Sequence, residues 1–255
     1  MKRIPRLLAF ALTAFLILYS CSAKKESAEK NLESCYSNTE IQSIFLNGES
    51  REYILYIPDS YDGVSTIPLV LNFHGFGESA SDFINNADMR TVSESNTFIL
   101  VYPQGSCLNG SSHWNACPTE GDNKSDLIAA VASVSGAMLD CIGSTSHPMP
   151  VVHLHGTYDG VLPYNGSSDW SSVQSTLDYW INFNKTITSP TVSNDNSGGM
   201  SVEHYIYDQG DSSVSVEHYK FIGGDHVWFS STFRGRNTSE LIWNFMSKYD
   251  INGLR

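Results

Sequence analysis

The segment His74-Gly75-Phe76-Gly77, which follows an apolar run beginning at Leu69, is where residue types and spacing first indicate chemistry. Glycine has no Cβ, so the backbone N–H groups of such a loop can turn toward a small anionic oxygen. N–H groups held in this way stabilise the oxyanion that forms when a nucleophile attacks a carbonyl carbon. The segment therefore predicts half of an oxyanion hole. The alternative is a tight turn between a strand and a helix that performs no chemistry.

The spacing of apolar residues around this loop predicts strands alternating with helices, which is typical of an α/β fold. A β-hairpin is predicted first, because two alternating apolar runs flank the turn Asn47-Gly48. The predicted strands are 41–46, 51–57, 69–73, 97–102, 128–136, 202–207, 214–221 and a run from 151 that ends in a Gly/Asp loop. The predicted helices are 82–94, 173–183 and 240–249, the last capped by Asn237 or Thr238, and 188–200 is a predicted polar loop.

Residues 103–126 interrupt this order. They are rich in Gly, Ser, Asn and Cys and have almost no apolar periodicity. The strands on either side, 97–102 and 128–136, are predicted to be parallel, and parallel neighbours need a crossover, normally a helix. No helix is readable here, and a structureless loop of this length counts against the assignment of elements. The pattern therefore predicts that an element is missing at this point.

Several segments, taken in order, resemble the secreted polyhydroxybutyrate depolymerases and feruloyl esterases. They are YILYIP at 53–58, PLVLNFHGFGES at 68–79, ILVYPQG at 99–105, Trp114-Asn115, AAVASVSGAM at 129–138, PMPVVHLHGTYDGVLPYNG at 148–166 and GGDHVWF at 223–229. The resemblance covers about Arg51 to Met246 and implies an α/β-hydrolase with a Ser-His-Asp triad. The expected fold is α/β, a mostly parallel sheet with an N-terminal antiparallel hairpin.

The resemblance also implies roles for individual residues. Asp159 matches the triad acid and His226 the triad base, and the chemistry fits, because an imidazole takes the serine proton while a carboxylate holds its tautomer. The N–H groups of Gly75 and Phe76 are expected to form the oxyanion hole, at about 3 kcal/mol per donor. The residues expected to line an acyl or aromatic pocket are Trp114, Tyr158 and Trp228. The alternatives are a turn residue at Asp159 and a structural loop histidine at His226.

One part of the family pattern is absent, because the nucleophile elbow Gly-x-Ser-x-Gly occurs nowhere in this sequence. Asp126 joins Leu127 directly where the family has a helix, the elbow strand and a second helix, ~30 residues or more by the size of a βαβ unit. This is also where the residue pattern lacks its crossover. Ser133 and Ser135 end a strand, but neither has glycines two residues before and two residues after it, as the elbow requires, so no nucleophile is assigned. Loss of a central strand exposes two strand edges, and we expect the flanking strands to close up.

The first 21 residues have the features of an export signal. A basic start, Met1–Arg6, precedes an apolar run, 7–18, that is too short to span a membrane. The ending Leu18-Tyr19-Ser20-Cys21 resembles a bacterial lipobox, in which Cys21 becomes lipid-modified; because Tyr19 is bulky for that pattern, plain secretion is the alternative. Export is predicted in either case, with a lipid anchor in the membrane in the first. Residues 22–39 are predicted to be a flexible tether, and 40–255 a single domain truncated internally near 126/127.

In an oxidising compartment the cysteines other than Cys21 are candidates for disulfides. Cys107 and Cys117 are close enough in their loop to form one, which leaves Cys35 and Cys141 as a second pair. The net charge of −12 argues against nucleic-acid binding. No Cys/His spacing is typical of a zinc site, and no metal or cofactor is predicted. Five other histidines are predicted to be structural: His74 in its loop, and His153, His155, His204 and His218 on strand faces.

These observations lead to two main functional hypotheses. The first is an exported carboxylic-ester hydrolase that acts on polyester or acylated polysaccharide substrates, as the resemblance implies. The alternative is a non-catalytic relative or deletion product without esterase activity, such as a surface binding protein. A carbohydrate-binding module is a third reading, which depends only on exposed aromatic residues, and these also occur in esterase pockets.

Overall fold

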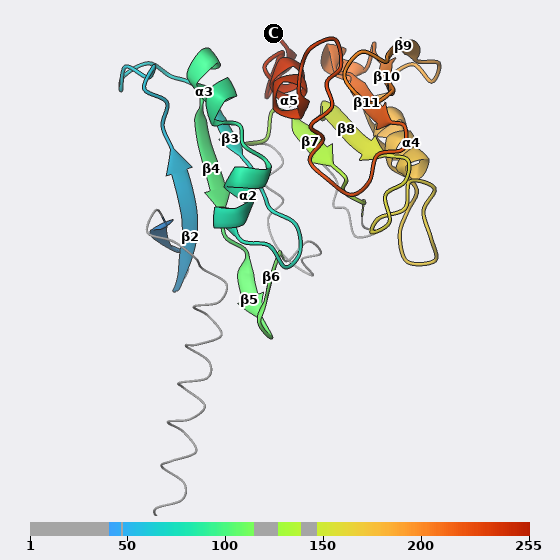
Figure 1. Ribbon diagram of the computed structural model, residues 1–255. Helices are drawn as coiled ribbons and strands as arrows, with labels where there is room; N and C mark the ends of the chain where they lie inside the picture. Colours follow the sequence, from blue (N-terminus) through green and yellow to red (C-terminus); the bar gives the residue numbers. More distant parts are fainter. Residues whose placement is uncertain (1–40, 47, 115–126, 139–146) are drawn as a thin grey trace, which may run out of the picture. The chain divides into compact units, whose positions relative to one another are not determined.

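The computed structural model describes residues 41–46, 48–114, 127–138 and 147–255. These residues form two compact α/β units (Figure 1). The first comprises the described residues up to 57 together with 64–85 and 98–114, and the second comprises 58–63, 86–97 and the described residues from 127 onward. The predicted signal segment 1–21 with Cys21, the tether 22–39, and Cys35, Asp126, Cys117 and Cys141 lie outside the described residues.

The first unit is organised around a four-stranded sheet with the order β1-β2-β4-β3. The strands are β1 (Ile41–Leu46), β2 (Glu49–Tyr56), β3 (Leu69–Leu71) and β4 (Ile99–Pro103), and the unit also holds α2 (Ala80–Asn86), β5 (Ser106–Leu108) and β6 (Ser111–His113). The predicted hairpin is confirmed, because β1 and β2 pair in antiparallel register. β4 is central in the sheet, with Leu100 and Tyr102 fully buried. β3 pairs with β4 in parallel.

β3 forms an edge of this sheet among the described strands. The N–H of Asn72 donates to the carbonyl of Val101, so the even-numbered residues of this segment face β4. The backbone groups of Leu69 and Leu71 therefore face away from β4. Their side chains are 58% and 42% exposed, and only Val70 is buried. The prediction of a buried strand is thus wrong for Leu69 and Leu71, because their side chains point to a face of the sheet that the described residues leave open.

The second unit contains a five-stranded sheet with the order β7-β8-β11-β10-β9. The strands are β7 (Val131–Val134), β8 (Val151–Gly156), β9 (Thr191–Asp195), β10 (Val202–Tyr207) and β11 (Val216–Phe221), accompanied by α3 (Arg90–Asn96), α4 (Val173–Asn184), the 3₁₀ turn η2 (Asp211–Ser213), α5 (Thr238–Met246), β12 (Tyr249–Asp250) and β13 (Gly253–Leu254). β7, β8 and β11 run parallel, whereas β11, β10 and β9 are antiparallel. All six residues of β8 are buried.

The helices of the second unit follow the predicted patterns closely. α4 places Val173, Leu177 and Ile181 against Val216 and Tyr207 of the sheet, which buries its apolar face. α5 begins with a capping box, in which the side chain of Asn237 accepts from the N–H of Glu240 and the Glu240 carboxylate accepts from the N–H of Asn237. In the described ranges no helix combines the length and apolar character needed to cross a membrane.

Several predictions of local structure are wrong. The helix predicted at 82–94 is two short helices, α2 and α3, because the chain turns at Asp88, whose carboxylate accepts from the N–H of Arg90. Two regions predicted as loops contain strands: the hairpin β5–β6, which turns at Asn109-Gly110, and β9. The strand predicted at 128–136 is shortened to β7, which is half-buried throughout.

The sheet arrangement also corrects the expected fold. Antiparallel pairings outnumber parallel ones in the two described sheets, so the prediction of a mostly parallel sheet is wrong. The physical reason is that β1 and β2, and likewise β9, β10 and β11, follow one another through connections too short for the crossover that parallel neighbours need. β3 pairs only with β4, and β7 only with β8, among the described strands. The expectation that these two strands close up stays a prediction.

Candidate active site

Asp159 and His226 are brought together by the topology of the second unit. β8 and β11 are parallel neighbours, so both strands end at the same edge of the sheet. Asp159 lies three residues beyond the end of β8, and His226 lies five residues beyond the end of β11. Backbone hydrogen bonds join the two loops, since the N–H of Thr157 donates to Phe221 O at 2.9 Å and that of Tyr158 to Gly224 O at 2.8 Å.

Two glycines make this approach of the loops possible. A Cβ added at Gly156 would lie 2.2 Å from the carbonyl oxygen of Gly224, and one at Gly224 would lie 2.9 Å from the ring of Phe229. Backbone atoms cannot yield to such a clash as the end of a flexible side chain can. The glycines in the predicted Gly/Asp loop and in the Gly-Gly-Asp-His segment therefore set the distance between the acid and the base.

The carboxylate of Asp159 is buried, and donors hold both of its oxygens. Oδ1 accepts from the N–H groups of Val161 and Leu162 at 2.9 and 2.7 Å, and Oδ2 lies 2.9 Å from His226 Nδ1. An ionised carboxylate only accepts, so Nδ1 of His226 carries the proton of this bond. Nε2 is then the basic nitrogen, on a side chain that is 37% exposed. This geometry suits a general base that an acid holds in one tautomer.

A second histidine contacts the same carboxylate. Nε2 of His155 lies 3.1 Å from Asp159 Oδ2 and 2.9 Å from the carbonyl oxygen of Leu162. Burial lowers the pKa of His155, although the hydrogen bond with Leu162 O and the charge of Asp159 each act to raise it. The prediction that His155 is a packed, hydrogen-bonded strand residue is confirmed. The sequence pattern did not predict the contact between His155 and Asp159, although the spacing of four residues between them could have indicated it.

Asp225 fixes the backbone of both loops. Its Oδ1 accepts from the N–H of His226 at 2.8 Å and from the N–H of Gly160 at 3.2 Å. These two backbone hydrogen bonds lower the pKa of the exposed Asp225 carboxyl group. This role of Asp225 was not predicted from the sequence, in which only its position next to His226 indicates a part in the site.

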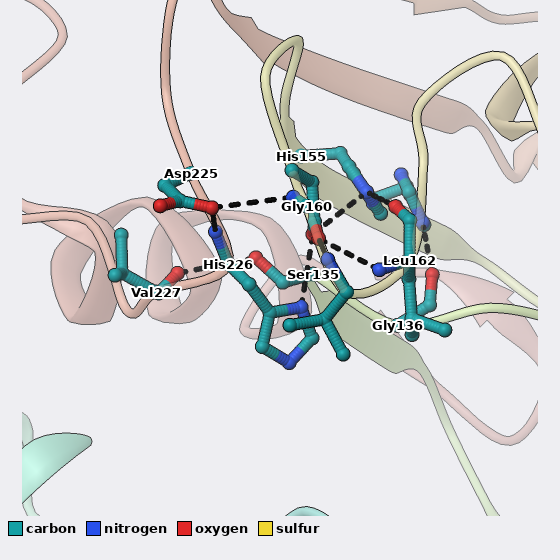
Figure 2. A network of polar contacts seen from close by, with 11 residues as sticks. Ser135, Gly136, His155, Gly160, Leu162, Asp225, His226 and Val227 are labelled. Atoms are coloured by element: carbon teal, nitrogen blue, oxygen red, sulfur yellow. Dashed lines mark hydrogen bonds and ion pairs between the residues drawn. The ribbon is translucent and has the colours of Figure 1, made fainter.

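Neither candidate serine is placed as a nucleophile. Ser135 is buried at the end of β7 with a φ of 51°, and its Oγ donates to Val227 O at 3.2 Å, as Figure 2 shows. Its hydroxyl thus holds the backbone beside His226. Ser133 lies on β7 itself. In the part of the chain that the structure describes, no hydroxyl group hydrogen-bonds to Nε2 of His226.

The predicted oxyanion loop lies in the first unit. The N–H of Gly75 donates to the carboxylate of Glu78 at 2.8 Å. Gly77 adopts a φ of 80°, which favours glycine, and its N–H donates to Ser112 O at 2.8 Å. Phe76 is 80% exposed, between these two residues. One of the two predicted oxyanion donors is therefore already bound to a side chain of its own loop.

His74 holds this loop in place, as the sequence predicted. Its ring lies 2.7 Å from Gly75 O through Nδ1 and accepts the N–H of Gly105 at 3.0 Å through Nε2. Burial lowers the pKa of His74, which favours the neutral ring that this pattern requires. Trp114 packs against His74, and its Nε1–H donates to His74 O at 2.7 Å. Trp114 therefore supports the loop.

The other predicted site residues divide between the two units. Tyr158, 78% exposed, and the half-buried Trp228 lie in the two loops that carry Asp159 and His226. Gly75, Phe76 and Trp114 belong to the first unit. The structure thus brings the acid and the base together in one unit, and the oxyanion loop and Trp114 together in the other.

No group of three or more His, Cys, Asp or Glu side chains within the described ranges could hold a metal ion. Cys107 is disulfide-bonded. The predicted pairing with Cys117 falls on a residue outside the described part of the chain.

Comparisons with known proteins point to esterases. No protein-family model matches the chain. It is 24% identical over 246 residues to a bifunctional acetylxylan esterase/xylanase (XynS20E) of Neocallimastix patriciarum, which covers 81% of this chain and 34% of the relative. It is also 24% identical over 179 residues to a probable feruloyl esterase C of Aspergillus clavatus, which covers 54% of this chain and 65% of the relative. The chain thus spans about a third and just under two thirds of these two relatives. These distant similarities support an esterase-type function at the level of the family.

Proposed function

We propose that this chain has the scaffold of a serine-type carboxylic-ester hydrolase in which Asp159 is the acid and His226 the base. The observation that carries the proposal is the 2.9 Å contact between Asp159 Oδ2 and His226 Nδ1, with Oδ1 held by two backbone N–H groups. Four independent features agree with it: the buried acid, the half-exposed base, the shared sheet edge and the glycines between the loops.

The chemistry of such a site follows from the positions of the protons. Nε2 of His226 takes the proton of a serine hydroxyl as the oxygen attacks the ester carbonyl carbon, and Asp159 stabilises the imidazolium. The negative charge then rests on the former carbonyl oxygen, which backbone N–H groups stabilise, a role that the resemblance implies for Gly75 and Phe76. As the intermediate collapses, His226 returns the proton to the leaving alkoxide, so the alcohol is released and the acyl group stays on the serine oxygen. A water molecule, deprotonated by Nε2 of His226 in the same way, then attacks the acyl carbon, and the acid is released as the serine regains its proton. For Gly75 to take part, the carboxylate of Glu78 must leave its N–H.

The proposed substrates are acyl esters of polysaccharides, in keeping with the names of the two relatives. Acetyl and feruloyl groups differ in the size of the apolar acyl part, which pocket shape selects. Of the pocket residues that the resemblance implies, Tyr158 and Trp228 lie in the loops that carry Asp159 and His226, whereas Trp114 packs against His74 in the first unit. A polyester of hydroxyalkanoate units is the alternative substrate class, because it presents the same ester bond.

The second candidate function is that of a relative without catalysis, since the chain as it stands lacks the nucleophile. We propose that a segment is missing between Asp126 and Leu127, where no Gly-x-Ser-x-Gly occurs. The alignment with the first relative is 246 positions long but covers 81% of this 255-residue chain, about 207 residues, so roughly 40 positions of the alignment have no residue in this chain. The alignment with the second relative, 179 positions long and covering 54% of this chain, leaves a similar number. A βαβ unit has about that size. The free edges of β3 and β7 among the described strands also fit a missing strand.

Export through residues 1–21, a lipid anchor at Cys21 and a disulfide between Cys107 and Cys117 remain part of the proposal. An exported position agrees with a polymeric substrate, which does not enter a cell. The disulfide of Cys107 agrees with an oxidising compartment.

The test compares two chains in hydrolysis of p-nitrophenyl acetate and butyrate. One is the chain as printed, and the other carries whatever coding sequence is read from genomic DNA at the Asp126–Leu127 junction. We expect turnover only in the chain with the added segment, and loss of that turnover in its His226→Ala variant. Near-UV circular dichroism checks that each protein is folded.

The other results are equally decisive. An uninterrupted junction together with a folded, inactive chain supports the non-catalytic candidate and overturns the missing segment. Turnover by the present chain that His226→Ala abolishes would mean that the chain holds a nucleophile not identified above, and Ser133 and Ser135 would be tested next. Turnover that is unaffected by His226→Ala would refute the assignment of the base.

A further inference from the structure

The second histidine at the acid, His155, is the strongest unassigned feature of the second unit. It lies on β8, four residues before Asp159, and its side chain is 2% exposed. Its Nε2 is within hydrogen-bond distance of two oxygens, Leu162 O at 2.9 Å and Asp159 Oδ2 at 3.1 Å. Figure 2 shows His155 and Leu162 on the side of the network away from Asp225.

The position of the proton on His155 follows from these partners. A backbone carbonyl and a carboxylate are both acceptors, so Nε2 must carry the proton that it shares between them. Nδ1 of His155 is buried and has no hydrogen-bond partner in the described part of the chain. A protonated Nδ1 would leave a buried donor unpaired, which costs more than an unpaired lone pair in a packed interior. His155 is therefore neutral with its proton on Nε2.

We propose that His155 is a positioning residue whose Nε2–H holds Oδ2 of Asp159 in line with Nδ1 of His226. This inference rests on the proposed roles of Asp159 and His226. Without His155, the carboxylate of Asp159 would have two backbone donors on Oδ1 but only His226 on Oδ2. The fourth donor comes from a rigid buried strand, so it opposes rotation of the carboxylate whenever the exposed His226 moves.

The groups around His155 define a matched control. His153 stacks on its ring with centroids 5.3 Å apart, and Tyr164 meets it edge-on at 5.9 Å. Lys220 is its register partner on β11. None of these three has a hydrogen bond or ion pair to Asp159 in the described part of the chain, and Nε2 of His153 lies instead near Gly136 O at 3.2 Å. His153 therefore shares the strand, face and burial of His155 without the contact.

The experiment is ¹⁵N NMR of the histidine side chains in the full chain, at a pH where His226 is neutral. We expect the parent to hold its His226 proton on Nδ1. In His155→Phe we expect this proton to exchange with solvent about fivefold faster, the factor for loss of one net hydrogen bond, and part of the population to move to Nε2. His155→Gln, whose amide N–H₂ can replace the donor, should stay close to the parent. His153→Phe should leave the His226 proton unchanged.

A second variant, in which His155 is kept and Asp159 is changed, tests the same contact in case His155→Phe does not fold. Asp159→Asn removes the charge that the Nε2 proton of His155 faces, so we expect this proton's resonance to shift upfield in that variant. Unchanged His226 exchange in His155→Phe, an equal effect from His153→Phe, or an unshifted His155 resonance in Asp159→Asn would each overturn the proposal. None of these readouts needs turnover, so a chain that fails the ester assay can still pass this test.

Discussion

We expect a low pH to destabilise the second unit, because several of its histidines are buried. The size of this loss of stability is worked out most directly for His153. Its side chain is 1% exposed between the rings of His155 and His218, at centroid distances of 5.3 and 5.5 Å. Burial, followed by the charge of a protonated His155, lowers the pKa of His153 from 6.5 to about 4. Burial acts in the same direction on the pKa values of His155 and His218.

The direction in which stability changes with pH follows from which state, folded or unfolded, binds more protons. The unfolded chain protonates this histidine below its ordinary pKa, whereas the folded chain keeps it neutral, so the unfolded state binds more protons in between. The contribution of His153 to stability is fully present above pH 6.5, is lost as the pH falls toward about 4, and changes no further below that. At 1.36 kcal/mol per pKa unit, the loss over this window is about 3 kcal/mol for His153 alone.

Urea unfolding at several pH values between 7.5 and 4, followed by tryptophan fluorescence, measures this loss. His153→Gln replaces the ring with a group that does not titrate and can still donate to Gly136 O. We expect its free energy of unfolding to depend on pH less than that of the parent, by about 3 kcal/mol across the window. Val152→Ala, on the same buried strand, should lower stability equally at every pH. Parallel pH dependences of the parent and His153→Gln would refute the reasoning.

Three further predictions concern single contacts. Gly156→Ala places a Cβ 2.2 Å from Gly224 O, so we expect a loss of about 1–3 kcal/mol in urea unfolding; an unchanged midpoint would contradict the close approach. Asn237→Ala removes the cap of α5 and should cost about 1 kcal/mol, whereas Asn237→Asp keeps the acceptor and should cost less; equal losses would show that the cap is not the cause. Leu71→Lys puts a charge on the free edge of β3 and should reduce self-association in sedimentation at high concentration; unchanged association would mean that this edge is not involved.

Much of the local structure was predictable from the sequence. The hairpin β1–β2 followed from alternation around Asn47-Gly48, and α4 and α5 from helical spacing and a capping residue. β8, a continuous apolar run with two histidines, was predicted and is fully buried. These elements depend on contacts within a few residues, which a sequence pattern records directly.

Other features were not predictable because they depend on distant partners. Leu69 and Leu71 are apolar like the residues of a buried strand, yet their side chains are exposed. Burial depends on which elements pack against the strand, and the apolar run itself does not contain that information. The hairpin β5–β6 is three residues per strand, too short for periodicity to indicate. The break between α2 and α3 depends on one side-chain hydrogen bond at Asp88.

The same division applies to the candidate site. The sequence alone determined the residue types at the ends of strands, the glycines beside them and the absence of a Gly-x-Ser-x-Gly elbow, because these are properties of the chain itself. Only the tertiary structure decided that Asp159 and His226 meet at 2.9 Å, that His155 contacts the same carboxylate, and that Glu78 occupies the N–H of Gly75. Such contacts join atoms whose directions are set by strand pairing and loop geometry, and neither is encoded in the spacing of any single segment.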